Sequence, residues 1–173
     1  MKVSYGITVH NEAEELQTLL EVLNKNIDKE DEIVVCVDGD DEKVEAVLGE
    51  SLSSWQNYIV YKRKLNKDFS AQKNSVIEKA SGDYIFHVDA DEYPHEVLLR
   101  DIKQIIEMNE GVDLIYLPRI NTVDGITEQH IQKWGWKVTA PYEIYNEKVM
   151  DTESEEYKLL KKMDLIVDEN IID

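Results

Sequence analysis

Residues 80–92 read ASGDYIFHVDADE, and this stretch sets the pattern from which the fold is inferred. Its centre, YIFHV at 84–88, is rich in β-branched and aromatic residues, which is typical of a buried strand and too short for a helix. Gly82 precedes this run and is the residue type that commonly ends a helix. Asp89 and Asp91 follow it at once. We therefore predict a helix, a strand at 84–88 and an acidic turn, in that order.

The same alternation of short apolar runs and amphipathic segments extends along the chain in both directions. Further strands are predicted at residues 3–9, 32–37, 58–62 and 113–117. Helices are predicted at residues 12–24, 41–49 and 70–80, and from Pro94 onward. Strands that are continuously apolar and alternate with helices indicate a parallel sheet that is covered on both faces. We predict an α/β fold with a mostly parallel, twisted sheet and helices on both faces.

Polar residues at the predicted helix starts suggest how two of the helices are capped. Asn11, with Glu14 three residues later, resembles a capping box for the first helix. Ser70 is the expected N-cap of the helix at 70–80.

The pattern weakens after Pro118. Segment 119–150 has no clear period, residues 154–163 look helical, and residues 165–167 form a candidate edge strand. A chain of 173 residues fits one domain. We expect a single domain over residues 1–173.

Composition excludes several classes of protein. The chain is 42% hydrophobic and 32% charged, which is typical of a globular domain, and no apolar run reaches the roughly 20 residues that span a bilayer. The acidic start and the lack of a signal-like cleavage site favour a cytoplasmic protein. The single cysteine, Cys36, excludes an internal disulfide and is expected in the core. A formal net charge of −18 disfavours nucleic-acid partners.

Acidic side chains follow three of the predicted strands. Glu12 follows the first strand, Asp38 the second, and Asp89 and Asp91 the strand at 84–88. Ligands of open parallel sheets bind beyond the carboxyl ends of the strands, so these residues are expected at one edge. Their mutual repulsion would be relieved by a divalent cation, and oxygen ligands suit Mg²⁺ or Mn²⁺. The sequence contains no glycine-rich phosphate loop, so a diphosphate would be held through the metal, as in a nucleotide-sugar site.

Four motifs in order resemble family-2 glycosyltransferases of the GT-A fold. They are ITVHNE at 7–12, EIVVCVD at 32–38, DFSAQKN at 68–74 and ASGDYIFHVDADE at 80–92, the last containing a DxD motif. The resemblance covers roughly residues 1–120 and is greatest to the short, often phage-encoded members and the lipopolysaccharide-core transferases. It implies that residues 1–118 bind a nucleotide-sugar and that 119–173 are a reduced acceptor-side half. A phage-encoded member would act in the host cytoplasm.

The resemblance also implies roles for individual residues. A nucleotide-diphosphate sugar, most simply a UDP-sugar, would be bound by a set from four motifs: Val9, Asn11, Glu12, Asp38, Lys73 and Asp89. Asp91 would be catalytic as the ligand of Mn²⁺ or Mg²⁺. The reaction would be inverting, with a carboxylate base activating an acceptor hydroxyl.

The second half offers less clear candidates. Relatives place a carboxylate base after a Trp-rich segment, and here KWGWK at 133–137 is followed by Glu143, with Asp124 and Glu128 as competitors. His130 is a candidate late metal ligand. Trp134 and Trp136 are expected either to stack on a sugar or acceptor or to cover the sheet. The acceptor stays open between a glycan, a lipid-linked molecule, a protein and a modified nucleic acid, and the sequence does not define an oligomeric state.

Three alternatives compete with this interpretation. Asp89 and Asp91 could simply stabilise the start of the helix near Pro94, because acids are favourable there. The chain could also be a non-catalytic nucleotide-sugar-binding module. A phosphohydrolase of the haloacid-dehalogenase type is a weaker alternative, because that class carries its Asp-x-Asp on the first strand and Tyr93 stands where it needs Thr or Val.

Overall fold

The computed structural model describes residues 1–118, 121–122, 127–135, 137–139 and 143–145. The chain divides into two compact units, Met1–Met108 and Asn109–Asp173. Among the described residues, no helix combines the length and the hydropathy needed to cross a membrane.

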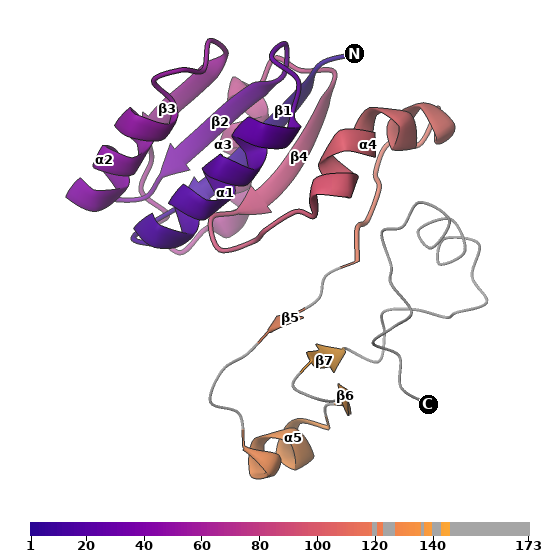
Figure 1. Cartoon of the computed structure of the whole chain (residues 1–173). Helices are drawn as coiled ribbons and strands as arrows, with labels where there is room; N and C mark the ends of the chain where they lie inside the picture. The colour runs from indigo at the N-terminus through magenta and orange to yellow at the C-terminus, as the bar shows by residue number, and fades with distance from the viewer. Residues whose placement is uncertain (119–120, 123–126, 136, 140–142, 146–173) are drawn as a thin grey trace. The chain divides into compact units, whose positions relative to one another are not determined.

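The first unit contains a four-stranded parallel sheet in the order β3-β2-β1-β4 (Figure 1). The strands run over Val3–Val9 (β1), Glu32–Val37 (β2), Tyr58–Lys62 (β3) and Tyr84–Asp89 (β4). All six residues of β2 are buried, as are all but Thr8 in β1, because these two strands lie in the middle of the sheet. The predicted parallel α/β fold is thus confirmed, and each strand lies within one residue of its predicted bounds.

Three helices connect the strands of this sheet, and a fourth follows β4. They are α1 (Ala13–Asn26), α2 (Glu42–Ser51), α3 (Phe69–Lys79) and α4 (Glu96–Met108). In Figure 1, α1 and α2 lie in front of the sheet and α3 lies behind it, so the sheet is covered on both faces as predicted. The inner face of α1 carries four leucines that are fully excluded from solvent: Leu16, Leu19, Leu20 and Leu23.

Two of the predicted helix caps are wrong by one or two residues. Helix α1 begins after Glu12, whose side chain makes no capping bond to the helix, and Asn11 is exposed. Helix α3 begins after Asp68, whose Oδ1 accepts a hydrogen bond from the N–H of Ala71 at 2.9 Å, so Ser70 lies inside the helix. An aspartate is as good an N-cap as a serine, and the sequence alone does not decide between neighbouring candidates.

Helix α3 packs very close to the middle of the sheet. A Cβ atom at Gly6 would lie 2.5 Å from Cγ1 of Val76, so only glycine fits at this point of β1. Val76 also contacts Val34 and Cys36, which places Cys36 in the core as expected. This close packing fixes the position of α3 over β1 and therefore positions the side chains at the start of α3.

A network of buried polar side chains lies at the amino ends of the strands. Oδ1 of Asp31, 1% exposed, accepts the N–H of Val3 at 2.9 Å and pairs with Nζ of Lys103 at 2.9 Å. Glu32 accepts hydrogen bonds from Ser4 and Ser81. These groups satisfy each other, and they join β1, β2 and the loop before β4.

The second unit contains short elements. They are α5 (Glu128–Trp134) and a three-stranded antiparallel sheet of β5 (Asn121–Thr122), β7 (Glu143–Tyr145) and β6 (Lys137–Thr139), in that order. The strand predicted at 113–117 is wrong: these residues pair with no described strand, and Tyr116 is 87% exposed. An apolar run becomes a strand only where a neighbouring strand accepts its hydrogen bonds. The elements predicted at 154–163 and 165–167 lie outside the described residues, and the single-domain organisation stays a prediction.

Candidate functional site

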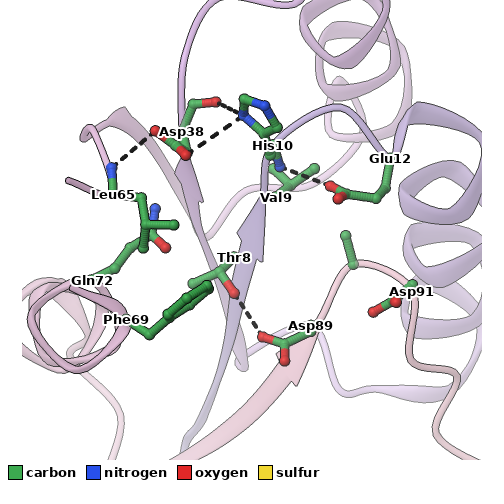
Figure 2. Close-up of a pocket in the computed structure, with 11 residues that line it drawn as sticks. Thr8, Val9, His10, Glu12, Asp38, Leu65, Phe69, Gln72, Asp89 and Asp91 are labelled. Carbon is green, nitrogen blue, oxygen red and sulfur yellow. Dashed lines mark hydrogen bonds and ion pairs between the residues drawn. The ribbon is translucent and has the colours of Figure 1, made fainter. Parts of the chain in front are cut away.

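A pocket of about 220 Å³ lies at the carboxyl ends of the parallel strands (Figure 2). Its lining comes from the ends of β1, β2 and β4 and from the start of α3: Thr8, Val9, His10, Glu12, Asp38, Leu65, Phe69, Gln72, Asp89, Ala90 and Asp91. The register explains this convergence, because Thr8 lies beside Asp89 and Val9 beside Val37, directly before Asp38. The prediction that four acidic residues from three strands meet at one edge is therefore confirmed.

Asp38 joins three segments at the edge of the pocket. Its Oδ1 accepts the backbone N–H of Leu65 at 2.9 Å, and its own N–H donates to the carbonyl of Val9 at 2.8 Å. The carbonyl oxygen of Asp38 lies 2.6 Å from Nδ1 of His10. Its other carboxylate oxygen, Oδ2, lies 3.6 Å from Nδ1 of His10, and 21% of the Asp38 side chain is exposed.

The loop after β1 is organised by Glu12. Its Oε2 accepts the backbone N–H groups of His10 at 2.8 Å and of Asn11 at 3.1 Å. His10 in turn packs on Gly39, whose φ of 98° is a conformation that favours glycine. The hydrogen bond to the Asp38 carbonyl raises the pKa of His10 above its usual value. His10 thus connects the loops that follow β1 and β2.

Asp89 contacts side chains of both β1 and α3. Its Oδ1 accepts the hydroxyl of Thr8 at 2.7 Å and lies 3.1 Å from Nζ of Lys73 (Figure 2 shows the Thr8 bond). Lys73 reaches Asp89 from the second turn of α3, so the predicted pair of nucleotide-site residues is in direct contact. Two residues earlier on β4, burial and the neighbouring Lys73 lower the pKa of His87.

Asp91 is the carboxylate best suited to hold a cation. It is exposed, lines the pocket, and forms no hydrogen bond or ion pair with any residue that the structure describes. Within the described ranges, no three His, Cys, Asp or Glu side chains are grouped closely enough to hold a metal by themselves. Mg²⁺ and Mn²⁺ commonly bind through one or two carboxylates and complete their shell with phosphate and water. The donor set therefore fits such an ion only when a diphosphate shares it.

Six pocket residues are not among the predicted site residues: Thr8, His10, Leu65, Phe69, Gln72 and Ala90. Leu65 and Phe69 flank a tight turn in which Asn66 and Lys67 both have positive φ, 51° and 64°, and the N–H of Asp68 donates to the Leu65 carbonyl at 2.9 Å. Positive φ at both central residues defines a type I′ turn, for which the sequence lacks the usual glycine. No sequence signal marks Phe69 as exposed, because its spacing to Gln72 and Val76 (i, i+3, i+7) is that of the buried face of α3.

The remaining candidates belong to the second unit. Glu143 is the first residue of β7, but its side chain, like that of Glu128, is not among those described; Asp124 and Trp136 lie outside the described residues. His130 is described, and its Nδ1 accepts the backbone N–H of Thr127 at 3.3 Å, capping α5. Its ring stacks on Trp134 with centroids 5.0 Å apart. Its role as a metal ligand stays a prediction.

Comparisons with known proteins agree with this geometry. The family model described as Glycosyl transferase family 2 matches residues 4–162. The poly(ribitol-phosphate) beta-glucosyltransferase of Bacillus spizizenii is 32% identical over 127 residues, which is 70% of this chain and 20% of that protein. The crystal structure of S. aureus TarS 1-349 superimposes with a TM-score of 0.57 at 21% identity, covering 94% of this chain and 55% of that one.

The same TarS fragment in complex with UDP-GlcNAc gives a TM-score of 0.57 at 21% identity, covering 95% of this chain and 48% of that one. At this identity the likeness to TarS supports the fold alone, a GT-A-like α/β sheet. The chain spans about a fifth of the curated relative and about half of these TarS structures. Since the family model covers nearly the whole sequence, the chain belongs to glycosyl transferase family 2.

Proposed function

We propose that this chain is a glycosyltransferase that takes a sugar from a nucleotide-diphosphate donor, most simply a UDP-sugar. The observation that carries the proposal is the convergence of Glu12, Asp38, Asp89 and Asp91, from three strand ends, on one pocket of a family 2 chain. Relatives add support for the donor, because TarS has been crystallised with both UDP and UDP-GlcNAc.

The acidic residues of the pocket differ in the hydrogen-bond partners that they already have. Asp38 and Asp89 are held by backbone or side-chain donors and keep acceptor capacity for the base and the ribose hydroxyls of a nucleotide. Lys73 is within ion-pair distance of Asp89 and offsets its charge, which reduces the repulsion that a diphosphate would meet in a protein of net charge −18. Val9, Asn11 and Glu12 would shape the loop against the same ligand.

Asp91 would hold the Mn²⁺ or Mg²⁺ together with the diphosphate. When bound, such an ion neutralises the charge that develops on the departing diphosphate. The protein contributes a carboxylate that no described residue competes for, next to Asp89, whose charge is already balanced by Lys73.

The reaction would invert the configuration at the sugar. The acceptor hydroxyl oxygen forms a bond to C1 of the sugar, the bond from C1 to the diphosphate oxygen breaks, and a carboxylate base takes the hydroxyl proton. Glu143 is the proposed base. A polyol-phosphate polymer is the first acceptor to test, because the curated relative is named for poly(ribitol phosphate); glycans, lipid-linked molecules, proteins and modified nucleic acids follow.

The test incubates the protein with a panel of nucleotide sugars and Mn²⁺ and measures the release of the nucleotide. Release of the nucleotide that occurs with one nucleotide sugar and is accelerated by one class of acceptor would support a transferase. Binding of UDP-sugars without release under any condition would instead support the non-catalytic binding module. Cleavage of simple sugar phosphates with no nucleotide requirement would favour a phosphohydrolase, a reading that membership of this family already disfavours.

A further inference from the structure

Phe69 is a large apolar side chain that the fold leaves in solvent. It is 66% exposed although it is the first residue of α3, a helix that packs closely on the sheet through Gln72 and Val76. A single exposed apolar residue is ordinary by itself. Phe69, however, lines the pocket, and Figure 2 shows its ring extending from α3 toward Thr8.

The backbone before Phe69 is held in an unusual conformation. Asn66 and Lys67 both lie in the left-handed region, where a residue with a side chain is strained. The turn is closed by the bond from Asp68 N–H to the Leu65 carbonyl, and Leu65 itself is held by Asp38. Such strain persists where the surrounding structure requires it, and it is common at ligand sites.

The turn and the helix start fix Leu65 and Phe69 on the same pocket. Asp68 caps α3 through Ala71, so the backbone of Phe69 is fixed on both sides. The result is an apolar part of the pocket, formed by Leu65 and Phe69, next to the hydrogen-bond acceptor Asp38. A planar heterocycle is bound by an apolar surface that contacts the face of its ring and by a hydrogen-bond acceptor at its edge.

We propose that Phe69, together with Leu65, forms the surface on which the nucleobase of the donor stacks, and that Phe69 is a specificity-determining residue of the site. This inference rests on the proposed function and names the part of the donor that α3 recognises. Stacking of a base on an aromatic side chain is sensitive to planarity, whereas the contacts of Asp89 and Lys73 with ribose and diphosphate are not.

Calorimetry with the full chain and Mn²⁺ tests the proposal. The probes are UDP, 5,6-dihydro-UDP, whose saturated ring is not planar, and inorganic pyrophosphate, which has no base. Phe69→Ala is expected to raise the Kd for UDP about 10-fold or more, to leave pyrophosphate binding unchanged and to abolish the preference of the wild type for UDP over dihydro-UDP. Phe69→Tyr is expected to retain all three affinities.

Ile77→Ala is the matched control, because Ile77 is 50% exposed and lies two turns along the same helix, outside the pocket. It should leave every affinity and the melting curve unchanged. An unaltered UDP affinity in Phe69→Ala would overturn the inference, and so would equal losses for UDP and pyrophosphate. A wild type that does not bind UDP would contradict the proposed function itself. A wild type that binds UDP as tightly as Phe69→Ala does would contradict only the role of Phe69, so the two failures are distinguishable.

Discussion

Replacing Gly6 by alanine should destabilise the protein by forcing α3 away from β1. The new Cβ would lie 2.5 Å from Cγ1 of Val76, far inside van der Waals contact. Val76 cannot easily move this methyl group, because a β-branched side chain in a helix has essentially one χ1 rotamer. Overpacking of this kind costs about 1–3 kcal/mol, and the gain from replacing glycine in a strand offsets about 0.5–1 kcal/mol. Because an approach of 2.5 Å requires neighbouring atoms to shift, the upper part of the overpacking range applies, about 2–3 kcal/mol, and the expected net loss of unfolding free energy is about 1–2.5 kcal/mol.

A double-mutant cycle measured by urea denaturation identifies the contact responsible. Val76→Ala alone removes two buried methyl groups and should cost about 1.5 kcal/mol or more, at about 0.8 kcal/mol per group. In the double variant the clash is absent, so its total cost should be lower than the sum of the single costs by about 1 kcal/mol or more. Because α3 carries Lys73 and Phe69, Gly6→Ala should also weaken UDP binding. Additive costs, or a Gly6→Ala protein as stable as the wild type, would refute the close packing of α3 on β1.

Three further perturbations test other parts of the account. Lys67→Gly should stabilise the fold by about 0.5 kcal/mol in urea denaturation, because relief of about 1–2 kcal/mol of left-handed strain exceeds the entropy cost of glycine; Lys67→Ala should give no such gain. In an NMR titration, His10 should titrate above and His87 below the ordinary value of about 6.5; titration of both at one pH would contradict the contacts described. Because its pKa is raised in the folded state, His10 stabilises the fold at acidic pH, and this contribution is lost as pH rises through its folded pKa. Because the pKa of His87 is lowered in the folded state, His87 destabilises the fold as pH falls below about 6.5. Glu143→Gln should leave the Kd for UDP unchanged and lower transfer, and a fully active variant would assign the base to another residue.

The sheet and its acidic edge were predictable because each depends on local composition. Runs such as EIVVCV at 32–37 are apolar throughout, and in a parallel sheet every strand end is brought to the same edge. Asp38 and Asp91 therefore follow from their position after a strand, without any knowledge of side-chain geometry. Asp41 was likewise expected at the start of a helix, and its carboxylate accepts the N–H groups of Lys43 and Val44.

The features that were missed depend on contacts between distant residues. Nothing local distinguishes the exposed Phe69 from a core aromatic residue, because its exposure results from the way α3 packs through Val76. The turn at Asn66 and Lys67 contains no glycine, so its positive φ values could not be predicted from the sequence. The run at 113–117 has the composition of a strand, but it forms no ladder with the described strands.

The most direct test is a calorimetric titration of UDP with and without Mn²⁺ into the wild type and the Asp91→Asn variant. The account predicts that Mn²⁺ tightens UDP binding to the wild type at least 10-fold, and that Asp91→Asn loses this gain while keeping the wild-type melting temperature and weak metal-free binding. Equal affinities with and without Mn²⁺, or a variant that responds to Mn²⁺ as the wild type does, would contradict the claim that Asp91 and a diphosphate share a divalent cation.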